Sequence, residues 1–191
     1  MSLSNILVIG HLIGLIIGLG AATVGDTIFF RALKNKRLAT EEFSLLQTIS
    51  RLIWIGLTIL ILTGIGIVLV KWQTVAGYHI PAKLWLKFIL TGILAANGLF
   101  IHYRIYPLLK DSLDQPLDKT PLAKHLKALT ISGAISLISW WSAFLLGGLR
   151  GLSFSFTELL GIYLVVILIG VMIAPMLGGV IFKQPPTKST A

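Results

Sequence analysis

The chain has 191 residues, of which 55% are hydrophobic and only 12% are charged, and its mean hydropathy is +0.91. A soluble domain of this length needs far more polar surface, so this composition excludes an ordinary soluble protein and favours the lipid bilayer as the solvent. Disulfides and thiolate metal sites are also excluded, because the chain contains no cysteine. The net charge of +9 does not predict a nucleic-acid partner, because the cations fall mostly between the apolar segments.

Five apolar segments reach the length of about 20 residues that a helix needs to cross a bilayer. We therefore predict an all-α fold, an integral membrane bundle of five transmembrane helices in one domain, residues 1–183, followed by a short tail, residues 184–191. The first segment is long enough to span and is preceded by no basic region, so we expect no cleavable signal peptide. The predicted spans are residues 6–30, 49–70, 81–106, 128–149 and 156–182.

The lysines and arginines are distributed unevenly over the loops that connect these spans. Twelve of the 16 flank the first and third connections or follow the fifth span, and four lie on the other side. Loops rich in lysine and arginine stay in the cytoplasm, so we predict an external N-terminus and a cytoplasmic C-terminus in the inner or plasma membrane. The four cations of the predicted outer side are Lys71, Lys83, Lys87 and Arg150.

Helix-start signals occur before three of the spans. Thr40 precedes two glutamates, which predicts that the second helix begins in the cytoplasm, ahead of its apolar part. Thr120-Pro121 is typical of a helix start, and residues 155–158 have the Ser-x-x-Glu pattern of a capping box. The polar segment between the third and fourth spans, residues 110–121, is expected to be a mobile linker.

Two spans carry stripes of small residues at helical spacing. Gly10, Gly14 and Gly18 lie on one face of the first helix, and the fourth helix has a similar serine-rich face. Small residues let helix backbones approach closely in lipid. These faces are expected to pack helices within the bundle or to join copies of the chain in a homo-oligomer, and they also offer room for a flat cofactor. The stripe of the fourth helix is Ser132, Ser136, Ser139, Ala143 and Gly147.

Ionisable residues inside the spans point to possible sites, because a charge at membrane depth is costly and usually faces the bundle interior. His11 lies about 8 Å past the outer start of its helix, at 1.5 Å per residue, and Lys87 lies at a similar depth on the third helix. Asp26 and Arg51 both lie near inner helix ends, where they could pair. Snorkelling to the interface is the alternative interpretation for Lys87 and Arg51.

Histidine is a good axial ligand for haem iron, because neutral imidazole coordinates the metal without burying a charge. His102 and His125 are both predicted near the cytoplasmic ends of their helices, so they are candidates for one site. His11 is more than about 20 Å away in depth and needs a separate site. We therefore take His11, His102 and His125 as candidate metal ligands. We expect His11 to hold or serve a cofactor rather than to stabilise the fold.

The first half of the chain resembles two families of small membrane proteins. A helix-1 histidine followed by glycines, a basic loop and the sequence KLWLKFIL at residues 83–90 look like the copper-resistance CopD group and the HemJ-type protoporphyrinogen oxidases. The resemblance covers about residues 6–110. It implies an all-helical membrane bundle with haem b or copper as the cofactor, and the HemJ-type resemblance implies functional roles for His11 and Lys87.

Two classes of function remain open from the sequence. The first is a haem b-binding membrane protein that acts in electron transfer or tetrapyrrole oxidation, with a redox partner or a larger membrane complex. The second is a non-catalytic accessory subunit, or a small permease of the copper type. Whether the protein is an enzyme is left open, because no HExxH, GxSxG, Walker or dinucleotide-binding motif is present.

Overall fold

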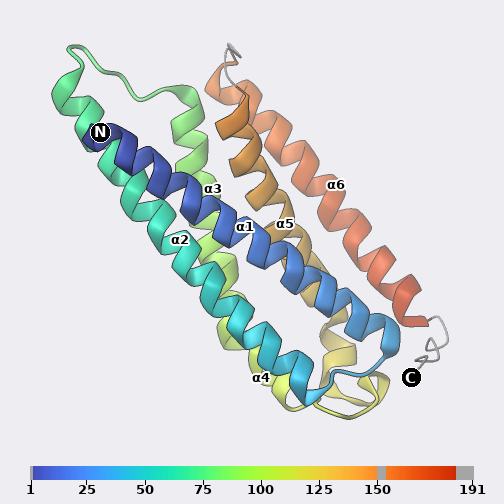
Figure 1. Cartoon of the computed structure of the whole chain (residues 1–191). Coiled ribbons are helices and arrows are strands. Elements are labelled where there is room, and N and C mark those ends of the chain that lie inside the picture. The colour runs from blue at the N-terminus through green and yellow to red at the C-terminus, as the bar shows by residue number, and fades with distance from the viewer. Residues whose placement is uncertain (1, 150–153, 184–191) are drawn as a thin grey trace.

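The computed structural model describes residues 2–149 and 154–183, and the regular elements of these ranges are helices, as the sequence predicts. The predicted tail, residues 184–191, and Arg150 lie outside the described residues. In chain order the elements are α1 (Leu3–Asn35), α2 (Thr40–Thr74), α3 (Ala82–Phe100), the π-helical segment η1 (Ile101–Ile105), α4 (Tyr106–Lys110), the 3-10 segments η2 (Leu117–Lys119) and η3 (Pro121–His125), α5 (Leu126–Gly148) and α6 (Phe156–Lys183) (Figure 1).

Five of the helical stretches are long and apolar enough to cross a membrane, and they coincide with the predicted spans. Large apolar side chains cover their outer surfaces. On α6, for example, Met172 and Met176 are each 69% exposed. In water such a surface would aggregate, whereas in lipid it is the expected exterior. The chain therefore has the architecture of a multi-pass membrane protein.

The bundle has two ends, which we name by what lies there (Figure 1). At the N-terminal end lie the start of α1, the end of α2, the start of α3, the end of α5 and the start of α6. At the loop end lie the end of α1, the start of α2, the residue 110–121 segment and the end of α6. The two ends differ in their charge, because most of the described lysines and arginines belong to the loop end.

The α1–α2 hairpin is built on glycines, as the small-residue stripe predicts. A Cβ atom on Gly14 would lie 2.9 Å from the carbonyl oxygen of Gly56, and one on Gly10 would lie 3.1 Å from a methyl of Thr63. The stripe therefore brings the backbones of α1 and α2 into contact within one chain. The hairpin is closed by Lys36, whose left-handed backbone (φ 53°) ends α1 and directs its amide to the carbonyl groups of Ala32 and Leu33.

Helix α5 packs on this hairpin and is the central helix of the bundle (Figure 1). Trp140 of α5 is 1% exposed, and its ring occupies the space that a side chain on Gly18 would need. Ser132 and Ser139, which belong to the predicted serine-rich stripe, point to two other helices. Ser132 pairs with Asn97 of α3, and the hydroxyl of Ser139 lies 3.0 Å from that of Tyr163 on α6.

The residue 110–121 segment packs against the α1–α2 turn, so it is not the free linker that the sequence predicts. Leu117 is 1% exposed, and its amide donates to the carbonyl oxygen of Lys36 at 2.9 Å. Asp114 accepts a hydrogen bond from the Thr40 hydroxyl at 2.6 Å and lies 3.5 Å from Arg37. The segment therefore closes the loop end of the bundle over the α1–α2 turn. This packing could not be predicted from the sequence, because the apolar residues of the segment are too few and too widely spaced to show a helical or strand period.

The predicted helix starts are close to the observed ones. The α2 helix begins at Thr40, and Glu42 caps it by accepting from the Ala39 amide at 3.1 Å. The capping box at residues 155–158 is present, since Glu158 accepts from the Ser155 amide at 2.8 Å. Pro121 begins a 3-10 turn that leads into α5 five residues later, so the fourth predicted helix begins less regularly than expected.

Candidate functional site

His11 contacts α2 through a hydroxyl group. Its Nδ1 lies 3.1 Å from Oγ1 of Thr63, and that hydroxyl donates its proton to the carbonyl oxygen of Ile59 at 2.6 Å. With the threonine proton assigned to the Ile59 carbonyl, the tautomer that satisfies both contacts carries its proton on Nδ1 of His11. Nε2 is then the nitrogen with a free lone pair, which is the form of histidine that can bind a metal.

Lys87 approaches the same region from α3, and its ammonium group lies within electrostatic range of the His11 imidazole. Its Nζ also lies 3.7 Å from the position of a Cβ atom on Gly147, the last small residue of the α5 stripe. The two residues that the family resemblance selects thus lie at the same, N-terminal end of the bundle. Neither of them lines either of the two cavities described next.

His102 lies in a groove of about 770 Å³ between α2 and the η1–α4 segment at the loop end. Arg51 and Lys110 line this groove with their exposed side chains, and Trp54, Tyr103 and Tyr106 supply aromatic walls. The ring of His102 packs edge-on against Tyr103, with 5.1 Å between centroids. This groove therefore combines one imidazole, two basic side chains and an aromatic lining.

A π-helical turn exposes His102 in the groove. Pro107 has no amide proton for the helix ladder, and its ring disfavours a regular helix just before it. The chain widens there by one residue, so that the Tyr106 amide donates to the carbonyl oxygen of Ile101, five residues back. Tyr106 is fixed in turn by its hydroxyl, which donates to the carbonyl oxygen of Leu46 at 2.7 Å. π-Turns of this kind occur frequently at functional sites.

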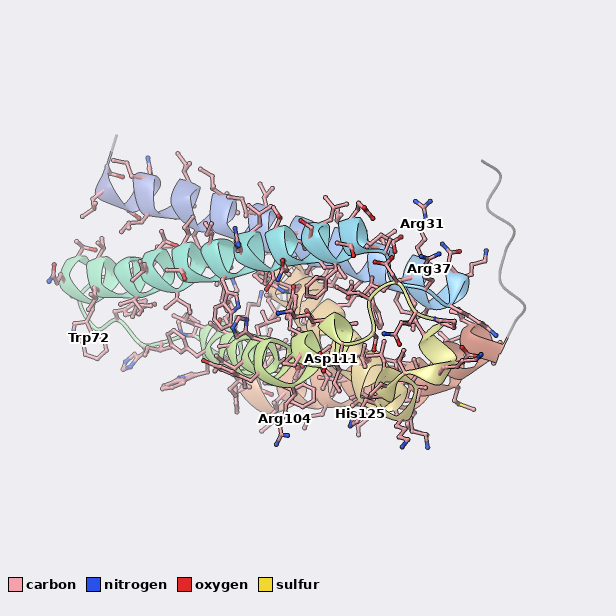
Figure 2. All side chains as sticks on the ribbon, turned by 90° about the horizontal axis from the view of Figure 1, so that it is seen from below. Arg31, Arg37, Trp72, Arg104, Asp111 and His125 are labelled. Atoms are coloured by element: carbon pink, nitrogen blue, oxygen red, sulfur yellow. The ribbon has the colours of Figure 1, made fainter. Side chains whose placement is uncertain are left out.

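His125 lies apart from the groove, although the sequence places it at a similar depth to His102. Its Nδ1 is 3.1 Å from the carbonyl oxygen of Pro121, within the same 3-10 turn. Figure 2 shows His125 and Arg104 on the outside of the bundle, with Trp72 far away at the N-terminal end. Among the described residues, no group of three or more histidine, aspartate or glutamate side chains is placed to hold a metal ion.

Asp26 does not pair with Arg51, so the predicted ion pair is wrong. Arg51 is exposed and lines the groove, whereas the Oδ2 atom of Asp26 is buried and has no hydrogen-bond partner among the described residues. The carboxyl group lines a partly open cavity of about 130 Å³ within the bundle, between α1, α2, α3, the η1–α4 segment and α5, which we call the internal cavity. Sequence reasoning missed this cavity, although an acidic residue inside an apolar span was a signal for it.

The groove and the internal cavity adjoin each other. Ser50, Trp54 and Tyr106 line both of them, so these three side chains form the wall between the two spaces. The candidate site of the protein is therefore a pair of adjoining spaces toward the loop end, with cations in the outer one and a carboxyl group in the inner one.

No family model matches the chain, and comparisons with curated proteins and with solved structures also find no match.

Proposed function

We propose that the protein is a multi-pass protein of the inner or plasma membrane, with its N-terminus outside and its C-terminus in the cytoplasm. The charge difference between the two ends supports this orientation. Twelve of the 16 lysines and arginines belong to the loop end by chain position, and the positive-inside rule assigns that end to the cytoplasm. The groove and the internal cavity then open in the cytoplasmic half of the membrane.

We further propose that the protein binds haem b in the groove and acts in membrane electron transfer or tetrapyrrole oxidation. The observation that carries this proposal is the position of His102 in a groove of about 770 Å³. That volume is typical of cofactor sites, which occupy roughly 300–1,000 Å³. Bound haem would supply an iron that exchanges single electrons, with its potential set by the axial ligand and the surroundings.

The chemistry of the lining fits an anionic, flat cofactor. His102 would hold the haem iron through its imidazole. Arg51 and Lys110 would pair with the two propionates, since guanidinium and ammonium groups are the usual partners of carboxylates. The rings of Trp54, Tyr103 and Tyr106 would pack against the porphyrin and exclude water from it.

His11 remains the competing ligand. It has a lone pair on Nε2 by the hydrogen-bond argument above, and the HemJ-type resemblance implies a role for it together with Lys87. The groove is the preferred site because His102 there has open space and two basic side chains beside it. The His11 ring instead lies against α2, where it contacts the Thr63 hydroxyl and lies next to Gly64.

The test is the visible spectrum of the purified protein and of three matched variants. A Soret band with sharp α and β bands on reduction is expected for the wild type. His102→Ala should lose or shift these bands, whereas His11→Ala and His125→Ala should keep them. Loss in His11→Ala alone would move the site to the N-terminal end. If the protein is colourless and stays colourless after haem is added, the haem proposal is wrong. The accessory-subunit or permease function then becomes the proposal.

A further inference from the structure

The internal cavity beside the groove has the lining of a small-molecule site. Most of its surface comes from apolar and aromatic side chains of α1, α2, α3, α5 and the η1–α4 segment, and a few polar groups converge on it. An apolar cavity with a few convergent polar groups is the usual form of a ligand site. The polar side chains are those of Asp26, Ser50, Asn97, Tyr106, Ser132 and Ser136.

Asp26 differs from its polar neighbours because its hydrogen bonds are not complete. Asn97 and Ser132 satisfy each other, with hydrogen bonds of 2.8 Å between side chains and 3.0 Å from the Asn97 amide to the Ser132 carbonyl. Tyr106 donates its proton to the carbonyl oxygen of Leu46. Oδ2 of Asp26 is buried and has no donor among the described residues. A buried acceptor without a donor destabilises a protein, so a ligand that donates there gains binding energy.

The cavity has the size of one aromatic ring. Its volume of about 130 Å³ is close to that of an engineered apolar cavity of roughly 150 Å³ that binds benzene. Phe29, Trp54 and Trp140 line it, and flat aromatic walls favour a flat aromatic guest. The cavity therefore fits a six-membered ring with one polar substituent.

The charges around the cavity favour a neutral ligand over a cation. Asp26 and Tyr106 are the titratable groups of its lining. The adjoining groove, which shares Ser50, Trp54 and Tyr106 with the cavity, carries Arg51 and Lys110. These cations repel a positive ligand at membrane depth, where charge interactions are strong. A neutral hydroxyl group satisfies the carboxyl acceptor without this repulsion.

We propose that the internal cavity binds a neutral aromatic ring that carries a hydroxyl group, with phenol as its simplest form, and that the hydroxyl donates to Asp26. This site goes beyond the haem proposal, because it uses a different cavity and a different polar group, Asp26, although Ser50, Trp54 and Tyr106 line both spaces. The ring would lie among the aromatic side chains that line the cavity, and Gly133 of α5 provides the space next to the carboxyl group. A Cβ atom on Gly133 would lie 3.6 Å from Oδ1 of Asp26, at ordinary contact distance.

The experiment compares three ligands on the purified full-length protein by their effect on the midpoint of thermal unfolding. Phenol and toluene have nearly the same shape, and only phenol can donate a hydrogen bond. We expect phenol to raise the midpoint in a saturable way and to bind about tenfold more tightly than toluene, the ratio that one hydrogen bond of about 1.4 kcal/mol supplies. Equal effects of phenol and toluene, or tighter binding of benzylammonium, would overturn the proposal.

Matched glycine variants locate the binding. Gly133→Ala adds one methyl group inside the cavity without a clash, whereas Gly92→Ala adds the same group where nothing lies within 4 Å. Phenol affinity should fall about tenfold in Gly133→Ala and in Asp26→Leu, and stay unchanged in Gly92→Ala. The haem spectrum should stay the same in all three variants, which separates this site from the groove. Wild-type phenol affinity in both Gly133→Ala and Asp26→Leu would contradict the assignment.

Discussion

A Cβ atom on Gly56 of α2 would lie 2.6 Å from the backbone nitrogen of Gly18 on α1. The two helix backbones are therefore in direct contact, with no side chain between them. In lipid the hydrophobic effect does not drive helices together, so close packing of this kind supplies much of the association energy. Gly14 and Gly18 on one helix and Gly56 on the other thus fix the α1–α2 hairpin, and the hairpin fixes one wall of the internal cavity.

Gly56→Ala is expected to destabilise the protein, because the added methyl group meets backbone atoms that cannot move away independently. Overpacking typically costs about 1–3 kcal/mol. Gly20→Ala is the matched control, since a Cβ atom at Gly20 meets nothing within 4 Å. The measurement is the midpoint of unfolding in detergent for both variants. Equal midpoints would show that the two helices separate without cost.

Trp140→Ala is expected to be far more disruptive than Trp141→Ala, although the two residues are neighbours in the chain. Trp140 is 1% exposed and fills the space over Gly18, whereas Trp141 is 44% exposed and packs against Phe144. Removal of a buried tryptophan side chain costs about 3–5 kcal/mol, because a large void remains. Unfolding midpoints of the two variants check this, and a larger loss for Trp141→Ala would contradict the packing.

The spans, their order and the glycine contact could be predicted from the sequence, for a physical reason. A helix in lipid must satisfy its backbone hydrogen bonds internally and present apolar side chains to the chains of the lipids, so its length and composition are visible in the sequence. Gly10, Gly14 and Gly18 follow a spacing of four, which places them on one face of any regular helix.

The candidate sites were harder to predict, because the sequence gives the depth of a residue but not the direction in which its helix faces. Asp26 and Arg51 have similar depths, yet one lines the internal cavity and the other the groove. The same holds for His102 in the groove and His125 in its own 3-10 turn. The π-turn before Pro107 adds a local rotation that a regular helical period cannot represent.

The proposed orientation predicts where reporter domains will be found. A reporter fused after residue 191 and another inserted between residues 114 and 115 should both behave as cytoplasmic. The residue 110–121 segment and the end of α6 lie at the same, cation-rich end of the bundle (Figure 1). A periplasmic or external result for either reporter would overturn the orientation.

The hydrogen bond between His11 and Thr63 predicts a small but specific effect on stability. Thr63→Val keeps the shape of the side chain and removes the acceptor for Nδ1 of His11. The expected loss is about 0.6 kcal/mol, the average for such bonds between transmembrane helices. Thr91→Val is the matched control, because the Thr91 hydroxyl bonds to the carbonyl oxygen of Lys87 in its own helix.

A double-mutant cycle completes that test. In a His11→Phe background, Thr63→Val should cost no more than the control Thr91→Val, because the imidazole is gone and the Thr63 hydroxyl keeps only its bonding to the backbone of its own helix. If Thr63→Val costs the same in both backgrounds, the threonine acts through its bond to Ile59 alone, and His11 is then not held by α2.

Asp26→Leu is expected to stabilise the protein in the absence of any phenol-like ligand. The substitution removes a buried acceptor that has no donor among the described residues and replaces it with a side chain suited to the apolar lining. Relief of one unsatisfied buried group is worth about 1–3 kcal/mol. Asp26→Asn, which keeps a polar group at the same place, should gain much less. The unfolding midpoints of both variants measure the difference. A clear loss of stability in Asp26→Leu would mean that the carboxyl group holds the fold, because an acceptor that serves only a ligand is dispensable when the ligand is absent.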